Sequence, residues 1–404
     1  MGYKIVVCGS GNVGHIVAGI AGGNAEIESC VYTKDEQKAI RWHAILEKEP
    51  LIIKQRNKGV ETTVSIAHEV LITSEAEEAA RNCDMIILAV PAFVHADYLK
   101  ELAPFMEDGV VIVGFPGQNG FEFETSTIVD LDNVVLMNFD SSPWSCRIQN
   151  FGSNACIVGR KAMIVAALRG DLGRSRIADP FSFIRELLCK DTKVVEASSM
   201  LAVSLMSINA YSHPAIMYYF WKNWDGKPLK EIPLFYQSIQ EETANFLTRI
   251  SEEGQRIGAA VKAQFPEEDM STFLSMFEWD LTRYSHMIED HTDQLSVLRT
   301  NRSYDGMLHP MIEVEGGFIP NFKQRFLSED VPYGLVPVRG IAEIVGVKTL
   351  LIDEILEWSQ AKLEKEYLVN GEFIGKDIKD TRAPQNFGYS TLNDIIWIKS
   401  ALLQ

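Results

Sequence analysis

A short apolar strand that runs directly into a glycine-rich turn opens this chain and limits what it can fold into. Tyr3–Cys8 is apolar and rich in β-branched residues, and the turn Gly9–Gly14 (GSGNVG) follows it and leads into a helical stretch. A G-x-G-x-x-G spacing between a strand and a helix is typical of a turn that binds the pyrophosphate of a dinucleotide. Gly9 permits the tight turn, Gly11 lets the backbone approach the phosphates, and Gly14 lets the helix pack on the strand.

The helix after the turn offers free N–H groups and the positive end of its dipole to the phosphates. We therefore expect the cofactor to contact four residues of this turn, which are Gly9, Gly11, Asn12 and Gly14.

The choice between NAD and NADP is made about 20 residues beyond the glycines, near the end of the second strand. Lys34 and Asp35 stand there. Asp35 can accept hydrogen bonds from the ribose hydroxyls and repel a 2′-phosphate, whereas Lys34 can attract one. Asp35 can also be the N-cap of the helix that follows. We expect NAD, used as NADH, and the sequence leaves open which of the two residues meets the ribose.

Strands and helices alternate along the first half of the chain. The expected strands are Tyr3–Cys8, Glu26–Thr33, Val70–Thr73, Met85–Val90, Val110–Gly114 and Val134–Asn138. The expected helices between them are His15–Gly22, Asp35–Leu46 and Ser74–Asn82. This alternation indicates an α/β fold with a Rossmann-type, doubly wound parallel sheet and helices on both sides.

The second half is mostly helical. We expect helices over Ala197–Trp221, Gln237–Phe265, Thr272–Ile288, Gly340–Tyr367 and Thr391–Leu403. The change in composition near residues 195–205 divides the chain into a cofactor domain, residues 1–200, and a helical substrate domain, residues 201–404.

Composition excludes several classes of partner. The net charge of −17 argues against nucleic acid, which is bound by clustered lysines and arginines. The longest apolar runs have the length of strands, so we expect no membrane span, and the first residues do not resemble a signal peptide. No CxxC pair exists, and we interpret the six cysteines as free thiols of a cytoplasmic protein. They are Cys8, Cys30, Cys83, Cys146, Cys156 and Cys189.

The histidines do not form a metal-binding pattern. His286 and His291 are five residues apart, a spacing that does not place two ligands on one helical face, and no HExxH motif is present. We expect no metal site. His213 stands out for another reason, which is the sequence around it.

The segment around His213 and seven others, in the same order and with similar spacing, resemble the opine dehydrogenase family, which includes octopine dehydrogenase. They are Pro116–Phe123 (PGQNGFEF), Ser142–Arg147 (SPWSCR), Tyr211–Ile216 (YSHPAI), Trp224–Pro228 (WDGKP), Pro233–Tyr236 (PLFY), Asn321–Pro332 (NFKQRFLSEDVP), Lys365–Gly371 (KEYLVNG) and Gly375–Asp377 (GKD). The resemblance covers almost the whole chain and is much more specific than the glycine pattern alone.

This resemblance implies a reaction and a set of residues. Such enzymes bind NADH, then pyruvate and an amino acid, and reduce the imine that the two form; the resemblance also implies a monomer. His213 would act as acid and base and pair with Asp330, and Arg325 would hold the charged cofactor or keto acid. Further matching positions place Gln118 and Ser141 at the pyruvate end, and Cys146, Asn209 and Trp279 at the amino-acid end.

Elementary chemistry agrees with these residue types. A ketone is a poor electrophile until its oxygen is hydrogen-bonded or protonated, and histidine exchanges protons near neutral pH. Arginine matches a carboxylate with two parallel bonds. Without the resemblance, His213 reads as a core or capping residue, Asp330 as a turn residue and Arg325 as a surface cation.

Two of the candidate site positions depart from the octopine enzyme, as do several positions around Asn209: Ser141 aligns with a threonine and Asn209 with a tyrosine. Loss of an aromatic surface disfavours a guanidinium, so we expect a small amino acid such as alanine, glycine, taurine or β-alanine rather than arginine. The alternatives are an arginine-using octopine dehydrogenase, and a ketopantoate reductase or glycerol-3-phosphate dehydrogenase, which use a catalytic lysine. A dinucleotide-binding sensor or structural protein is the non-enzyme alternative.

Overall fold

The computed structural model describes residues 2–57 and 59–398, and it divides them into two units. The first unit consists of residues 2–117 and 124–200, and the second of residues 118–123 and 201–398. The short segment 118–123 therefore belongs with the helical second unit, although it comes from the first half of the sequence.

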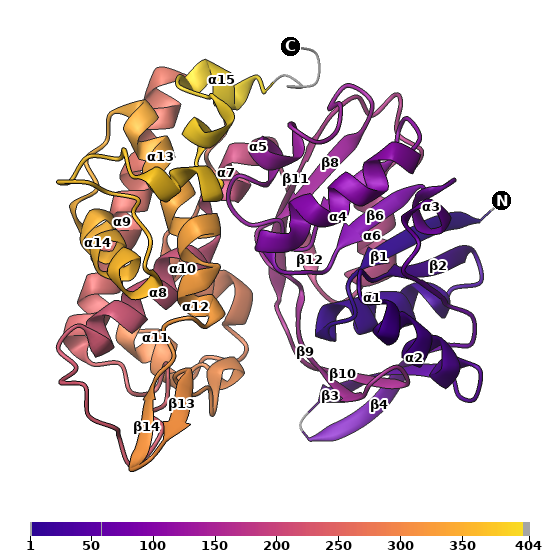
Figure 1. Cartoon of the computed structure of the whole chain (residues 1–404), viewed down its shortest axis with the longest axis horizontal. Helices are drawn as coiled ribbons and strands as arrows, with labels where there is room; N and C mark the ends of the chain where they lie inside the picture. Colours follow the sequence, from indigo (N-terminus) through magenta and orange to yellow (C-terminus); the bar gives the residue numbers. More distant parts are fainter. Residues whose placement is uncertain (1, 58, 399–404) are drawn as a thin grey trace. The chain divides into compact units, whose positions relative to one another are not determined.

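A sheet of eight strands forms the centre of the first unit (Figure 1). In spatial order the strands are β12 (Lys193–Ala197), β11 (Met163–Arg169), β8 (Val135–Phe139), β7 (Val111–Gly114), β6 (Met85–Leu88), β1 (Tyr3–Cys8), β2 (Ile27–Tyr32) and β5 (Leu71–Thr73). All neighbours are parallel except β8 and β11. The predicted α/β fold with a parallel sheet is confirmed, and all six predicted strands are present.

Helices connect the strands of this sheet. They are α1 (Asn12–Gly22), α2 (Glu36–Leu46), α3 (Ala76–Ala80), α4 (His95–Leu102), α5 (Phe121–Thr125) and α6 (Pro180–Leu188), with 3₁₀ turns at Ala92–Val94 and Ala103–Phe105. The chain moves from β1 to β2 and β5 in one direction, and then returns to β6 and β7 on the other side of β1. Because parallel crossovers are right-handed, this reversal places helices on both faces and makes the ends of β1 and β6 the switch point of the sheet.

A second sheet of four strands in the first unit was not expected from the sequence. Its order is β4 (Val60–Ala67), β3 (Leu51–Asn57), β10 (Asn154–Arg160) and β9 (Trp144–Asn150). Apolar and polar residues alternate in β9 (WSCRIQN) and in much of β4 (VETTVSIA), a pattern typical of strands with one covered face that the prediction did not use.

His15 connects helix α1 to this second sheet. Its Nδ1 lies 3.0 Å from the carbonyl oxygen of Gly11, and the N–H of Gly152 donates to its Nε2 at 3.0 Å. The ring stacks on Trp42, with centroids 3.9 Å apart. Burial lowers the pKa of His15 to about 4, so the ring is neutral at pH 7 and keeps the acceptor that Gly152 needs.

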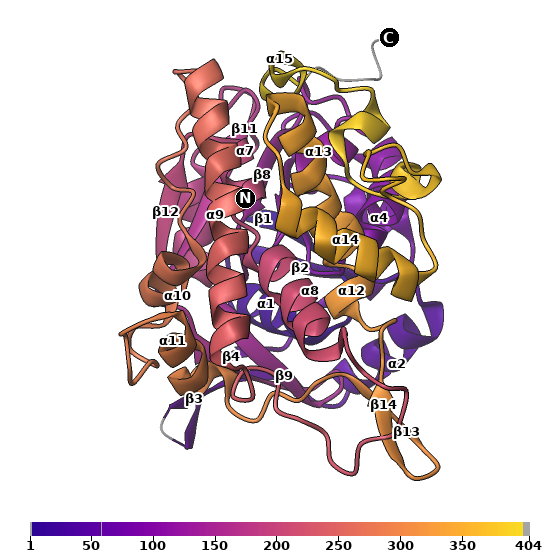
Figure 2. The same ribbon diagram turned by 90° about the vertical axis from the view of Figure 1, so that its left-hand side faces the viewer.

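The second unit contains most of the remaining helices, and Figure 2 shows the long α9 beside α8. Its helices are α7 (Met200–Leu205), α8 (Ile208–Trp221), α9 (Glu241–Gln264), α10 (Met276–Tyr284), α11 (Gln294–Thr300), α12 (Arg325–Ser328), α13 (Val336–Val345), α14 (Leu350–Leu363) and α15 (Leu392–Ile396). Shorter elements are the hairpin β13 (Met311–Val314) and β14 (Gly317–Pro320), a π-helical turn at Val331–Leu335, and 3₁₀ turns at Arg302–Tyr304, Lys376–Asp380 and Pro384–Phe387.

Two of the predicted long helices are wrong. The stretch 197–221 is divided into α7 and α8, because Ser207 adopts an extended conformation with ψ at 91° and starts a new helix. The stretch 340–367 is divided into α13 and α14, because Gly346 at the end of α13 adopts the left-handed conformation with φ at 73°. The last predicted helix is confirmed only over Leu392–Ile396, and its end lies outside the described residues.

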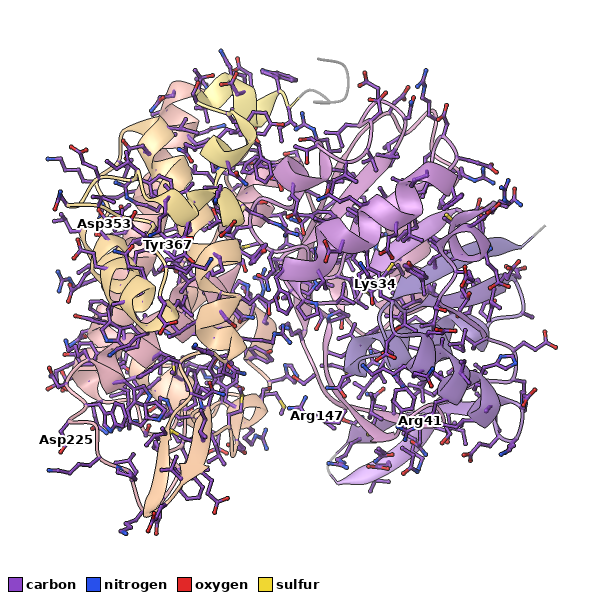
Figure 3. All side chains as sticks on the ribbon, in the orientation of Figure 1. Lys34, Arg41, Arg147, Asp225, Asp353 and Tyr367 are labelled. Carbon is purple, nitrogen blue, oxygen red and sulfur yellow. The ribbon has the colours of Figure 1, made fainter. Side chains whose placement is uncertain are left out.

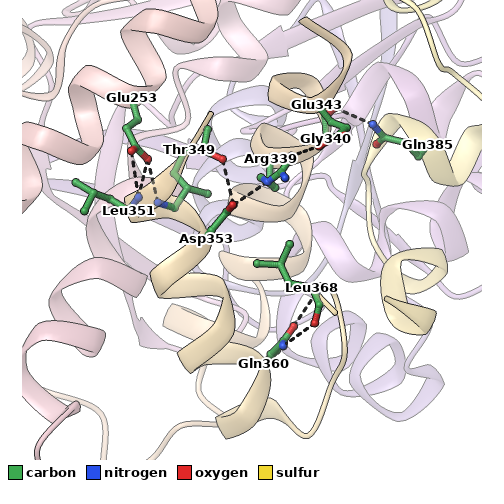
Figure 4. A network of polar contacts seen from close by, with 11 residues as sticks. Glu253, Arg339, Gly340, Glu343, Thr349, Leu351, Asp353, Gln360, Leu368 and Gln385 are labelled. Atoms are coloured by element: carbon green, nitrogen blue, oxygen red, sulfur yellow. Dashed lines mark hydrogen bonds and ion pairs between the residues drawn. The ribbon is translucent and has the colours of Figure 1, made fainter. Parts of the chain in front are cut away.

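Hydrogen bonds and an ion pair of buried charged residues connect helices α9, α13 and α14 of the second unit (Figure 4). The carboxylate of Glu253 on α9 accepts hydrogen bonds from the N–H groups of Leu351 and Ile352 at the start of α14. Arg339 on α13 pairs with Asp353 on α14 at 2.7 Å. The negative carboxylate at the positive end of α14 is a favourable arrangement, and it positions α14 against α9.

Candidate functional site

The glycine-rich turn has the shape that a phosphate group requires. Gly9 has φ at 108°, a conformation that favours glycine. A Cβ on Gly14 would lie 2.1 Å from the carbonyl oxygen of Gly9, so only glycine allows α1 to approach β1 this closely. A Cβ on Gly11 would meet no atom of the protein within 4 Å. Helix α1 begins beside this open space without a side-chain cap, so its first N–H groups are available to an anion.

The other two candidate cofactor residues of the first unit have local partners. The side-chain oxygen of Asn12 accepts a hydrogen bond from Ile148 on β9 at 2.8 Å and so ties the turn to the second sheet. Asp35 is the N-cap of α2: it accepts from the N–H of Lys38 at 3.0 Å and pairs with the Lys38 ammonium at 3.1 Å. The capping alternative for Asp35 is therefore the one that the structure contains.

His213 is held on three sides. Its Nδ1 lies 2.8 Å from Oδ2 of Asp330, and its Nε2 lies 3.1 Å from the hydroxyl of Tyr236. Phe326 stacks on the ring, with centroids 4.1 Å apart. The carboxylate of Asp330 can only accept, so the neutral ring carries its proton on Nδ1, and Nε2 accepts from the Tyr236 hydroxyl. Burial raises the pKa of Tyr236, which keeps this hydroxyl protonated.

Asp330 stands at the junction of two turns. It is the N-cap of the π-helical turn Val331–Leu335, which continues into α13. Its own N–H donates to the carbonyl oxygen of Arg325, and the N–H of Leu335 donates to its carbonyl oxygen. Short π-helical segments are frequent at functional sites, and this one directs the Asp330 carboxylate towards α8.

Arg325 begins α12, five residues before Asp330. Its Nε donates to the buried carboxylate of Glu329, one turn further on, while 59% of its side chain remains exposed. The ion pair with Glu329 orients the guanidinium, and its exposed part can meet an anionic ligand.

Two further candidate residues, Asn209 and Gln118, lie on helix α8 or contact its N-cap. Asn209 is half-buried and lies one helical turn before His213, so both side chains project from the same face of the helix. The hydroxyl of Ser207, at the N-cap of α8, donates to the side-chain oxygen of Gln118 at 2.5 Å. Gln118 itself has φ at 66°, an uncommon conformation for a residue with a side chain.

The three remaining candidate substrate residues differ in their elements and contacts; they are Ser141, Cys146 and Trp279. Ser141 follows β8, and its hydroxyl donates to the carboxylate of Asp140 at 3.3 Å. Cys146 is buried on β9, and burial raises the pKa of its thiol to about 12, so it is not an activated nucleophile. Trp279 is buried on α10, in the second unit, with the Arg283 guanidinium 5.2 Å from its ring centre.

The sequence reasoning missed Tyr236 and Phe326, the partners that hold the His213 ring. Both lie in segments that the family resemblance had already marked, but no local pattern indicates that a tyrosine 23 residues from the histidine meets its ring nitrogen. Within the described residues, no group of three or more histidine, cysteine, aspartate or glutamate side chains is arranged to hold a metal ion. The six cysteines are buried and form no disulfide there. None of the described helices combines the length and apolar character of a membrane span.

Comparison with known proteins decides the family. Residues 196–363 match the α-helical domain of NAD/NADP octopine/nopaline dehydrogenase. An opine dehydrogenase of Haliotis discus hannai is 39% identical over 97% of this chain and 98% of its own length, and a tauropine dehydrogenase of Arabella iricolor is 37% identical over 97% and 99%. A solved octopine dehydrogenase structure with NADH and L-arginine matches with a TM-score of 0.90 at 37% identity, over 98% of both chains. The chain belongs to the opine dehydrogenase family.

As a member of the opine dehydrogenase family, the chain is an NAD-dependent oxidoreductase. Residues 4–141 also match the N-terminus of NAD-dependent glycerol-3-phosphate dehydrogenase, but this match ends within the first unit. A ketopantoate reductase structure matches at 15% identity with a TM-score of 0.55, a likeness of fold alone. His213 and Asp330 lie within residues 196–363, which match the α-helical domain of octopine/nopaline dehydrogenase.

We predict that Gly11→Val weakens NADH binding at least about tenfold, equivalent to ~1.4 kcal/mol, while the protein still folds. The added side chain enters the open space beside the helix N-terminus and meets no atom of the protein at its Cβ. Gly14→Ala, in contrast, forces α1 away from β1 and lowers the melting temperature. Titration with NADH and thermal unfolding separate the two effects, and Gly159→Ala, whose Cβ fits at 3.8 Å, is the control. Unchanged NADH affinity in Gly11→Val would contradict the assignment.

Proposed function

We propose that this chain joins pyruvate to a small amino acid with NADH, and that the reaction is reversible. Residues 1–200 serve as the cofactor domain and residues 201–404 as the substrate domain of a cytoplasmic monomer. Family membership supports this reaction, because relatives carry the names opine, octopine and tauropine dehydrogenase. A neighbouring octopine dehydrogenase structure contains NADH and pyruvate. The single observation that carries the proposal is the buried His213 with Asp330 on one nitrogen, because this pair supplies the acid that the chemistry needs.

The chemistry has two parts. The amine attacks the keto carbon of pyruvate, and water leaves as a C=N bond replaces the C=O bond. Reduction then adds a hydride to that carbon and a proton to the nitrogen, which gives a secondary amine. The nicotinamide supplies the hydride when NADH is bound. The protein must therefore protonate a departing oxygen and keep the reacting groups in place.

His213 carries out the proton transfers in this proposal. Asp330 keeps the proton of the neutral ring on Nδ1, so Nε2 is the nitrogen that gains and loses the catalytic proton. The imidazolium that forms is stabilised by the adjacent carboxylate. Tyr236 holds Nε2 until the keto oxygen takes its place, so the ring stays in one orientation throughout.

We assign the binding of the two substrates to the other residues that the family resemblance marks. The partly exposed guanidinium of Arg325 pairs with the pyruvate carboxylate or a cofactor phosphate, as its two-pronged geometry allows. Gln118 and Ser141 hydrogen-bond the pyruvate end. Asn209, one turn before His213, faces the amino-acid end together with Cys146 and Trp279.

A small amino acid fits Asn209 better than arginine does. The side chain of asparagine offers hydrogen bonds but no flat aromatic face for a guanidinium. Overall similarity does not select the amine, because octopine and tauropine dehydrogenases are equally identical to this chain, at 37%. We therefore attribute the choice to individual side chains, and to Asn209 first.

We predict that the purified protein oxidises NADH with pyruvate only when an amine is present. The measurement is NADH absorbance with pyruvate alone and with alanine, glycine, taurine, β-alanine or arginine. Pyruvate reduced as fast alone as with the best amine would identify a simple hydroxy-acid dehydrogenase and refute the proposal.

We predict that His213→Ala lowers kcat by about 10²–10⁴-fold, the usual contribution of a positioned acid, while NADH still binds. Asp330→Asn loses less, because an amide can still orient the ring. Tyr236→Phe removes only the hydroxyl that meets Nε2. Its matched control is Tyr304→Phe, because that hydroxyl donates to Asp280 and not to the histidine.

The alternative for His213 is a packing role alone. In that case His213→Ala lowers the melting temperature but leaves kcat per folded molecule almost unchanged. Both quantities are measured on each variant, and kcat per folded molecule separates the two roles.

We predict that Asn209→Tyr raises kcat/KM for arginine relative to alanine by about tenfold, within the range of a cation–π contact. Asn209→Leu is the control, because it fills similar space without an aromatic face. An equal gain in both variants would show that volume, and not the aromatic ring, selects the amine. A wild-type preference for arginine would show that Asn209 does not set the specificity.

A further inference from the structure

Lys34 is the residue of the first unit best placed to attract a 2′-phosphate. It lies two residues after the end of β2, near where the ribose of a bound dinucleotide lies in folds of this type, and Figure 3 labels it. A lysine at this position favours NADP on sequence grounds. Its actual partners therefore bear on which cofactor the protein accepts.

Glu101 on α4 occupies the ammonium of Lys34. The Lys34 Nζ lies 2.8 Å from one carboxylate oxygen of Glu101. The hydroxyl of the buried Tyr32 donates to the other oxygen, and the Tyr98 ring centre lies 6.0 Å from the same ammonium. Burial acts to raise the pKa of Glu101, but the hydrogen bonds from Lys34 and Tyr32 outweigh it and lower that pKa. Glu101 is therefore ionised at neutral pH.

The next positively charged residue along the chain, Lys38, also has a carboxylate partner. Lys38 pairs with Asp35 at 3.1 Å, and Asp35 caps α2 as well. Lys34 and Lys38 thus each have a carboxylate, so the end of β2 presents no surplus positive charge. The hydroxyls of an NAD ribose are neutral and tolerate this balance, whereas a 2′-phosphate brings about two negative charges.

We infer that Glu101 is a specificity-determining residue that excludes NADPH. Its carboxylate neutralises the Lys34 ammonium and, like that of Asp35, would repel a 2′-phosphate. A 2′-phosphate must either displace Glu101 from Lys34 or remain beside the negatively charged Glu101 carboxylate, which repels it. The pair is partly exposed, so it contributes little to stability and matters through the charge it presents. This inference rests on the proposed use of NADH.

The test measures the binding of NADH and of NADPH to the purified protein by fluorescence titration. Glu101→Gln keeps the size of the side chain and removes its charge. We expect it to tighten NADPH binding about tenfold, as one unit charge at short range does, while NADH binding changes less than about twofold. Adding Lys34→Met to Glu101→Gln removes the gain, because the freed ammonium is its source.

Asp97→Asn is the matched control. Asp97 lies on the same helix and is exposed, and no ion pair of Asp97 is found in the described part of the chain. It should leave the ratio of NADH to NADPH affinity unchanged. Unchanged NADPH affinity in Glu101→Gln, an equal gain in Asp97→Asn, or a gain that survives Lys34→Met each overturns the inference. A wild-type protein that binds neither cofactor refutes the proposed function instead.

Discussion

The close approach of helix α1 to strand β1 is the constraint on which the first unit depends. Gly14 meets the carbonyl of Gly9 at a distance that no side chain tolerates, and this contact aims the start of α1 at the open space beside Gly11. The same helix carries His15, whose neutral ring bonds to Gly11 on one side and to Gly152 on the other. The glycine-rich turn is therefore held in place both by the packing of α1 on β1 and by the hydrogen bond from Gly152, which follows β9 of the second sheet.

In the second unit the corresponding constraint is the pairing of a buried histidine with a buried carboxylate. His213 comes from the middle of α8 and Asp330 from a π-helical turn more than a hundred residues later. Removing either partner leaves a polar group buried without compensation, which is costly, so stability and chemistry depend on the same contact. The aromatic rings of Phe326 and Tyr236 complete the enclosure and exclude other orientations of the imidazole.

The charges at the end of β2 illustrate how a local sequence signal can mislead. Lys34 read alone favours a phosphate, and Asp35 read alone favours a ribose hydroxyl. In the structure Lys34 faces Glu101, and Asp35 caps a helix, which is one of the two alternatives that the sequence left open. Glu101 lies far along the chain, and only the packing of α4 beside β2 brings it to Lys34. Partners of this kind are invisible to any motif because motifs read neighbours in sequence.

The sequence by itself determined the glycine turn, the buried strands of the parallel sheet and the helical character of the second half, because these depend on local spacing and hydrophobic runs. Its resemblance to a family marked His213, Asp330 and Arg325. It did not reveal the second sheet, in which β3 pairs with β10 about 100 residues later in the chain, nor the breaks at Ser207 and Gly346, which depend on single backbone conformations. Only the tertiary structure decided that Tyr236 meets His213 and that Glu101 meets Lys34, because these contacts join residues whose separation in sequence carries no information about distance in space.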